Sequence, residues 1–179
     1  MLVDDIIRRV EGWLTLKEGR LLYNLARKSK KCIVEIGAWK GKSTICLALG
    51  SAHGFCVPVI TVDHFHGSKE HGRVDTFKDF VRNVAHANVD KYIVVYKMKS
   101  AEAAQRFGMT IDMLFIDGSH EYEDVKTDYL LWTKKLVRGG VLAMHDSNWP
   151  GVKAVIRNFM RHDFKKLKRV DSVVWGRKI

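Results

Sequence analysis

Short apolar runs alternate with longer amphipathic stretches through most of this chain. The runs occupy residues 32–36, 57–62, 92–96, 113–116 and 141–144. Consecutive apolar side chains over so few residues are typical of strands that are covered on both faces of a sheet. Helical patterns fill the intervals, near residues 42–50, 75–88, 101–107, 121–135 and 151–160. This alternation predicts an α/β fold with a doubly wound, mostly parallel sheet.

The two ends of the chain extend this core. Residues 2–10 and 15–28 carry leucine, isoleucine and valine at helical spacing, so we expect two amphipathic helices there. Residues 164–170 and 172–177 are two extended runs joined tightly around Asp171, which leaves no room for a crossover helix. They should pair as an antiparallel hairpin, completing a seven-stranded Rossmann-like sheet. We expect one domain over residues 1–179, divided into N-terminal helices (1–30), a core (31–150) and a final helix with the hairpin (151–179).

A strand, a glycine turn and a helix start follow one another between Val34 and Thr44. Gly37 lets the chain turn and lets a ligand approach the backbone, because no Cβ stands in the way. The helix that opens at Gly41 presents free N–H groups, which favour a negatively charged group, and Ser43 adds a hydroxyl. The glycine spacing alone is also compatible with a plain strand–helix turn.

Two acidic residues favour a ligand-binding role for this turn. Glu35 lies two residues before Gly37 at the strand end, where its carboxylate suits an ammonium group of the ligand. Asp63 ends the next strand, where one carboxylate can accept both hydroxyls of a ribose. The alternative for Asp63 is a cap on a helix or turn.

Polar residues also end two later strands. Asp117 follows the fourth apolar run, and His145 and Asp146 follow the fifth. Ligands bind at the carboxyl ends of strands in an open parallel sheet, so these acids should converge with Asp63. Asp117 and Asp146 could hold Mg²⁺, which prefers oxygen ligands, and His145 could complete the site. The alternative is an acidic site that holds no metal.

His120 is the candidate for a general base. It lies three residues beyond Asp117, where it could remove the proton of a substrate hydroxyl whose pKa a bound metal lowers. The alternative is a structural cap on the helix that follows. On that helix we expect Asp124 and Asp128 to be solvated, and Arg138-Gly139-Gly140 to form a helix stop and turn.

The composition of the chain indicates the class of protein and the compartment in which we expect it. The 179 residues are 46% apolar and 28% charged, which suits one folded domain. No apolar run approaches the ~20 residues that cross a bilayer, and the first residues lack the pattern of a secretory signal. Three cysteines without a CxxC pair argue against a disulfide framework, so we expect a cytoplasmic protein. The net charge of +11 favours anionic partners, nucleic acid included, although a solvated basic surface is the simpler explanation.

Four segments resemble a known family. They read VEIGAWKGKST, VDHFHG, MLFIDGSHEYEDVKTDYLLW and VRGGVLAMHDSN, and they fall within residues 31–150. They are similar to class I S-adenosylmethionine-dependent methyltransferases, in particular to macrocin-type sugar O-methyltransferases and cephalosporin-hydroxylase-like proteins. The loop from Glu35 to Ser43 is also similar to that of catechol-type O-methyltransferases.

The resemblance implies roles for individual residues. It implies that the methyl donor is bound by Glu35, Gly37, Ala38, Trp39, Gly41, Ser43, Asp63, Ser100 and Asp117, with the segment 99–101 beside the adenine. It also implies Mg²⁺ at Asp117 and Asp146 and a base at His120. Relatives often carry two consecutive acids where this chain has His145 and Asp146. Residues 64–71 are similar to a segment near the active site of glycan-associated members, and their histidines, His64, His66 and His71, could instead bind zinc.

The function implied is O-methylation of a small hydroxylated acceptor, such as a sugar or glycan, which could be anionic. A nicotinamide-dependent oxidoreductase is disfavoured because Trp39 is too large for a close approach of pyrophosphate. Methylation of RNA, suggested by the charge, and a non-catalytic nucleoside-binding module remain alternatives. The chain is short for its relatives, so a second subunit could complete an open pocket in a homo-oligomer.

Overall fold

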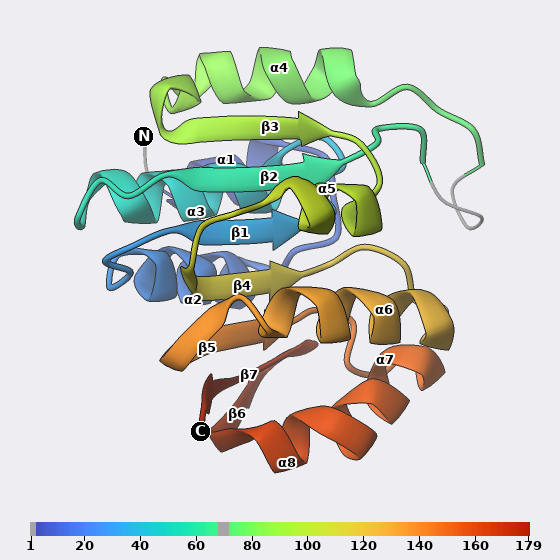
Figure 1. The fold of residues 1–179 in the computed structure, drawn as a ribbon. Helices are drawn as coiled ribbons and strands as arrows, with labels where there is room; N and C mark the ends of the chain where they lie inside the picture. The colour runs from blue at the N-terminus through green and yellow to red at the C-terminus, as the bar shows by residue number, and fades with distance from the viewer. Residues whose placement is uncertain (1–2, 68–71) are drawn as a thin grey trace.

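The computed structural model describes residues 3–67 and 72–179, and its strands form one seven-stranded sheet (Figure 1). The strands are β1 (Ile33–Ile36), β2 (Val59–Asp63), β3 (Ile93–Lys97), β4 (Ile111–Ile116), β5 (Leu136–Met144), β6 (Phe164–Val170) and β7 (Val173–Lys178). Their order across the sheet is β3-β2-β1-β4-β5-β7-β6. The first five strands run parallel, whereas β7 is antiparallel to both β5 and β6. The predicted mostly parallel sheet with an antiparallel end is confirmed.

Helices lie in the predicted intervals. They are α1 (Val3–Arg9), α2 (Leu16–Ala26), α3 (Lys42–Ala52), α4 (Phe77–His86), α5 (Ser100–Arg106), α6 (Tyr122–Thr133), α7 (Pro150–Val155) and α8 (Arg161–Asp163), with a 3-10 turn η1 (Asp90–Tyr92) and a π-helical turn η2 (Ile156–Met160). The first predicted helix is confirmed from Val3 onwards, and Leu2 lies outside the described residues. Within the described part of the chain, no helix is long and apolar enough to cross a membrane.

Two hydrophobic cores cover the two faces of the sheet. Met113 and Phe115 of β4 pack in the core that includes residues of α1, α2, α3 and α4. Leu114 and Ile116 of the same strand pack in the core that includes residues of α5, α6 and α7. Figure 1 shows α5 and α6 on the near side of the sheet and α2 and α3 behind it. Because neighbouring side chains of a strand point to opposite faces and both faces are buried, the strands have unbroken apolar sequences.

The strand order also places the site. From β1 the chain moves outward to β2 and β3, and then returns to lay β4 on the other side of β1. The connections that leave the carboxyl ends of β1 and β4 therefore run to opposite sides of the sheet. Such a reversal opens a crevice at the strand ends, where ligands bind in open α/β sheets.

The segment Arg138-Gly139-Gly140 corrects one prediction. It was expected to be a helix stop and turn, but α6 ends earlier, at Thr133, and the segment lies inside the nine-residue strand β5. Gly139 has φ 77°, a conformation that suits glycine, and the pairing of β5 with β4 is irregular between Ile111 and Met113. The glycines thus accommodate an irregular start of β5.

Candidate functional site

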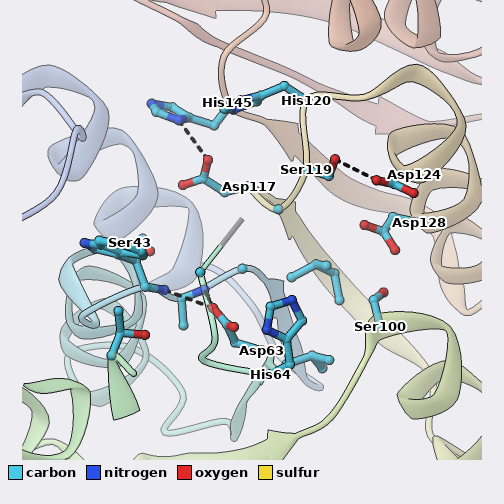
Figure 2. Close-up of a pocket in the computed structure, with 18 of the residues that line it drawn as sticks. Ser43, Asp63, His64, Ser100, Asp117, Ser119, His120, Asp124, Asp128 and His145 are labelled. Atoms are coloured by element: carbon cyan, nitrogen blue, oxygen red, sulfur yellow. Dashed lines mark hydrogen bonds and ion pairs between the residues drawn. The ribbon is translucent and has the colours of Figure 1, made fainter. Parts of the chain in front are cut away.

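A cavity of about 800 Å³ opens at the carboxyl ends of the parallel strands. Its walls come from the turns that follow β1 to β5, and they include Gly37, Asp63, Met98, Asp117 and Asp146. Figure 2 shows Asp63 and Asp117 on neighbouring walls of this cavity. The expectation that these two acids share one crevice is confirmed.

Gly37 allows the turn after β1 to lie directly against β4. Its φ is 88°, and a Cβ at this position would stand 2.1 Å from the carbonyl oxygen of Asp117. Its backbone N–H donates to the carbonyl of Val62 at 2.9 Å, which ties the turn to β2. Gly37 therefore meets both requirements that glycine satisfies, a positive φ and a close approach of two backbones.

The residues after Gly37 divide between the cavity and the protein interior. Ala38, Trp39 and Ser43 line the cavity. Gly41 is the N-cap of α3 with φ 90° and is not part of the lining, since it packs beside Phe80. The predicted contact between Gly41 and a ligand is therefore not supported; its contribution is to start α3.

Asp63 holds the glycine turn in place. One carboxylate oxygen accepts hydrogen bonds from the backbone N–H groups of Ala38, at 2.8 Å, and Trp39, at 3.0 Å. The other accepts from the N–H of Phe65 at 2.6 Å. Asp63 lines the cavity as expected, and it also caps the turn, so the two alternatives left open by the sequence apply together.

Glu35 does not face the cavity. Its fully buried carboxylate accepts hydrogen bonds from the hydroxyls of Ser43 at 2.5 Å, Thr44 at 2.5 Å and Thr61 at 3.0 Å. Burial raises the pKa of Glu35 to about 7, against the opposite effect of the three hydroxyls. The structure thus corrects the prediction that Glu35 binds an ammonium group. Its side chain points to the face of the sheet that α3 covers, where it anchors the first turn of that helix.

Two histidines and two carboxylates form a connected cluster after β4 and β5. Nδ1 of His145 lies 2.9 Å from Asp117 and 3.1 Å from Asp146. Nε2 of His120 lies 2.9 Å from the same oxygen of Asp146. The ring of His120 also stacks on that of Trp149, with centroids 4.5 Å apart. Asp117, His120, His145 and Asp146 therefore meet as the sequence predicted, and all four line the cavity.

Carboxylates face both ring nitrogens of His145 within this cluster. Its other nitrogen, Nε2, lies 3.4 Å from Glu18 of α2, and its side chain is 3% exposed. Burial lowers the pKa of His145, but Asp117 and the hydrogen bonds to Asp117, Asp146 and Glu18 outweigh it and raise the pKa to about 12. Both ring nitrogens then donate to carboxylates, and neither has a lone pair for a metal.

The carboxylates respond to that charge. Burial raises the pKa of Asp146, yet the hydrogen bonds from His120 and His145 lower it well below its usual range. Burial also raises the pKa of Asp117, while His145 opposes the change. Asp146 is therefore ionised at neutral pH and holds His120 in a fixed orientation.

Asp128 overturns another expectation. It is 8% exposed, whereas the sequence suggested a solvated position on α6. Burial raises the pKa of Asp128 to about 6, against the opposing effect of the nearby Ser100 hydroxyl, whose oxygen accepts from Trp132 Nε1 at 2.8 Å. Asp124, one turn earlier, is exposed as expected and accepts from Ser119 at 2.8 Å. Figure 2 shows Asp128 and Ser100 facing each other on the side of the cavity away from Ser43.

The histidines of residues 64–71 are only partly described. His64 and His66 line the cavity, and their rings stack with centroids 5.9 Å apart. His71 lies outside the described residues, so the predicted three-histidine zinc site stays a prediction. Of the described side chains, Asp117, His145 and Asp146 are the group whose potential metal-ligating atoms all lie within 4.8 Å of one another.

The sequence missed three residues of the site: Glu18, Asp128 and Trp13. Glu18 is the N3 residue of a capping box with Thr15, a pattern that is visible in the sequence but signals a helix start rather than a site. Asp128 is four residues before the buried Trp132, so it lies on the inward face of α6. Trp13 stands in the α1–α2 connection, and no pattern in the sequence marks it.

Comparisons with known proteins agree with this geometry. A family model described as a methyltransferase domain matches residues 34–147, more than half of the chain. A curated relative, the uncharacterized protein y4gI of Sinorhizobium fredii, is 30% identical over 118 residues, which cover 64% of this chain. The chain spans only 13% of that relative's length.

Solved structures share the fold at low sequence identity. An O-methyltransferase from Bacillus cereus in complex with SAH is 19% identical with a TM-score of 0.68, covering 98% of this chain and 90% of its own. CalS11, a TDP-rhamnose 3'-O-methyltransferase of calicheamicin biosynthesis, is 16% identical with a TM-score of 0.66, covering 89% of this chain and 76% of its own. These likenesses confirm the Rossmann-like methyltransferase fold. The family match confirms the resemblance seen in the motifs and the expectation of an enzyme: this chain belongs to the methyltransferase domain family.

Proposed function

We propose that this chain is an S-adenosylmethionine-dependent O-methyltransferase that acts on a hydroxyl of a small acceptor, such as a sugar or glycan. The single observation that carries the proposal is the joining of two elements in one cavity. The glycine turn with Asp63 suits a nucleoside that carries an amino acid, and the His120–Asp146 pair suits removal of a hydroxyl proton. The family match and the B. cereus structure with SAH support the choice of donor.

The donor site follows from the cavity walls. The backbone N–H groups at the N-terminus of α3 suit the amino-acid carboxylate of the donor, whereas the Ser43 hydroxyl donates its proton to Glu35. Because Glu35 is turned away, Asp117, whose backbone lies against Gly37, is the carboxylate left to accept the ammonium group. A carboxylate has about four acceptor positions, and Asp63 uses three on backbone N–H groups. Asp63 therefore accepts one ribose hydroxyl rather than the two expected.

His120 is the proposed base. Asp146 faces its Nε2 at 2.9 Å and Trp149 stacks on its ring, so the imidazole is held in one orientation from which it takes the proton of the acceptor hydroxyl. The deprotonating oxygen attacks the sulfonium methyl in line; a C–O bond forms, the C–S bond breaks, and S-adenosylhomocysteine leaves. Holding both reactants in the cavity supplies much of the acceleration, since effective molarity contributes about 7–11 kcal/mol. General base catalysis adds on the order of 10²–10⁴-fold.

A divalent cation such as Mg²⁺ fits beside this base. Asp117 and Asp146 supply the carboxylate oxygens that Mg²⁺ prefers, and both line the cavity. His145 was expected to complete the site, but its nitrogens face carboxylates, so we assign it as their counter-charge instead. A bound ion would orient the acceptor hydroxyl and lower its pKa.

The acceptor side of the cavity is aromatic and basic. Trp13 lines the cavity, is 61% exposed, and lies beside Trp39 with ring centroids 5.4 Å apart. An exposed indole face suits the apolar face of a sugar ring. Arg73 and Lys99 also line the cavity and favour an acceptor that carries negative charge. The fold shared with CalS11, a sugar methyltransferase by its name, supports this acceptor class.

Two substitutions separate donor binding from chemistry. Asp63→Ala removes both the ribose contact and the support of the glycine turn, so we expect it to abolish binding of S-adenosylhomocysteine in calorimetry. His120→Ala should bind the product normally and turn over a panel of sugar acceptors on the order of 10²–10⁴-fold more slowly. Repeating the assay with EDTA tests the metal, and slower turnover that Mg²⁺ restores is the expected result.

Each experiment also has a result that would contradict the proposal. Full activity of His120→Ala would remove His120 from the mechanism, and activity indifferent to EDTA would remove the metal. The alternatives from the sequence give different patterns in the same assays. Methylation of RNA in place of every small acceptor would favour the nucleic-acid enzyme, whereas donor binding without any turnover would indicate a non-catalytic nucleoside-binding module.

A further inference from the structure

We propose that Asp128 reads the 6-amino group of the donor's adenine and makes the enzyme selective for an amino purine over a 6-oxo purine. This inference rests on the proposed function, because it assumes that S-adenosylmethionine occupies the cavity. It assigns a specificity role to a residue of α6 that lies outside the glycine turn and outside the His120–Asp146 pair.

The position of the adenine ring follows from the order in which the groups of the donor lie along the cavity. The glycine turn and the start of α3 take the amino-acid end, and Asp63 takes the ribose. The adenine ring must then lie beyond Asp63, in the part of the cavity walled by Met98, Ser100 and Gly118. In Figure 2 this part lies on the side away from Ser43, where Ser100 and Asp128 face each other.

A buried carboxylate forms the end of this compartment. Asp128 is more than nine-tenths buried and lines the cavity, and its carboxylate faces Ser100 (Figure 2). The Ser100 oxygen accepts a hydrogen bond from Trp132 Nε1 at 2.8 Å, so the Ser100 hydroxyl can turn its proton toward Asp128. A carboxylate can accept about four hydrogen bonds. Buried polar groups are normally satisfied, so this acid requires further donors from whatever fills the compartment.

The adenine of the donor can supply the hydrogen-bond donors that Asp128 needs. The 6-amino group of adenine offers two N–H donors at the edge of a planar ring. A 6-oxo purine presents an acceptor at the same position, which would place two oxygens with lone pairs against each other. Gly118 adds no side chain to the space beside this carboxylate, where a Cβ would stand 3.6 Å from Oδ2 of Asp128. Ile36 and Val62 supply apolar surface for the ring face.

Asp124 shows why one carboxylate and not the other is assigned. It lies one turn earlier on the same face of α6 and also lines the cavity. However, it is exposed to solvent and accepts from Ser119 at 2.8 Å. Asp124 is therefore already paired and hydrated at the surface, whereas Asp128 presents its carboxylate to the cavity from a buried position.

The test compares two products in calorimetry with the full chain: S-adenosylhomocysteine and S-inosylhomocysteine, its 6-oxo analogue. A hydrogen bond to a charged group is worth enough to predict at least about tenfold tighter binding of the adenine form to the wild type. Asp128→Asn keeps the size of the side chain but offers both an acceptor and a donor. We therefore expect its preference to fall below about threefold, through weaker binding of the adenine form.

The control is Glu123→Gln, which removes the same charge from an exposed position on the same helix and should retain the wild-type preference. Thermal unfolding followed by circular dichroism verifies that Asp128→Asn is folded. Equal affinity of the wild type for the two products would overturn the inference, and so would an unchanged preference in Asp128→Asn. A wild type that binds neither product would instead overturn the proposed function, so the two failures are distinguishable.

Discussion

Single buried acids determine the local geometry of this site. Glu35 is the clearest case, because three hydroxyls from β2 and α3 converge on one carboxylate that has no access to solvent. Such an arrangement fixes the first turn of α3 against β1. Burial also raises the pKa of this carboxyl group, since removing a carboxylate from water favours its protonated form.

The raised pKa of Glu35 predicts how the stability of the fold depends on pH. The pKa of Glu35 is raised from its ordinary 4.5 to about 7, so between these values the folded state holds a proton that the unfolded state has lost. Stability should therefore fall as the pH rises from about 4.5 to 7 and then level off. In urea titrations at pH 5 and 8, we expect Glu35→Gln to lose less stability than the wild type, by on the order of 2–3 kcal/mol.

The exposed Glu102 provides the control for this measurement. It pairs with Arg106 one turn away on α5, and Glu102→Gln should leave the wild-type pH dependence in place. If Glu35→Gln shows the same slope as the wild type, Glu35 is ionised in the folded protein, and burial does not control its protonation.

At the scale of elements, the connections after β1 and β4 bring the site together. The two turns touch through their backbones at Gly37 and Asp117, and this contact sets the distance between the donor loop and the acidic cluster. The start of α7 makes a similar approach to the turn after β4. A Cβ on Gly151 would stand 2.1 Å from the carbonyl oxygen of His120.

Gly37→Ala should therefore disrupt the donor site. The added Cβ would meet the Asp117 carbonyl at 2.1 Å, and the φ of 88° is strained for any L residue with a side chain. We expect binding of S-adenosylhomocysteine to become undetectable in calorimetry, together with a lower melting temperature.

Gly139→Ala separates the clash from the strain. Gly139 has a similar φ of 77°, but a Cβ there would meet nothing within 4 Å. This variant should lose about 1 kcal/mol of stability and keep its affinity for the product. Equal loss of binding in both variants would show that the contact between the two turns is not what forms the donor site.

At the scale of the whole molecule, elements from both ends of the chain reach the cluster of Asp117, His120, His145 and Asp146. Glu18 of α2 accepts hydrogen bonds from the backbone N–H and the hydroxyl of Ser172, both at 2.7 Å, in the turn of the β6–β7 hairpin. The same carboxylate faces His145 and closes the capping box with Thr15. Burial raises the pKa of Glu18, yet the hydrogen bonds from His145, Thr15 and Ser172 lower it to about 2. One ionised side chain thus joins the N-terminal helices, the hairpin and the site.

Glu18→Ala should destabilise the fold strongly. It leaves the His145 cation buried with one carboxylate fewer, and breaking such a pair from one side typically costs about 3–5 kcal/mol. We expect a loss of that size in the free energy of unfolding from urea titration. Glu11→Ala is the comparison, because Glu11 pairs with Lys40 at an exposed position and should cost less than about 1 kcal/mol. A similar small loss for Glu18→Ala would mean that His145 is neutral in the fold.

Much of this molecule could be predicted from local sequence. Apolar runs of strand length mark β1 to β4, and the tight connection at Asp171 marks the hairpin, because strand periodicity and turn chemistry act over a few residues. The acids that follow strands were placed correctly at one edge, since parallel strands share a carboxyl end. Gly139 shows the limit: a glycine that ends a helix and a glycine inside an irregular strand are alike in sequence.

The sequence by itself thus determined the order of elements, the glycine turn and the convergence of Asp63, Asp117, His120 and Asp146. Only the tertiary structure decided which acids face the cavity. Glu35 turns inward and Asp128 turns toward the ligand space, because the direction of a side chain depends on how its strand or helix packs against the other layer. Glu18 meets His145 across 127 positions of the chain, a contact that packing creates and no local pattern signals.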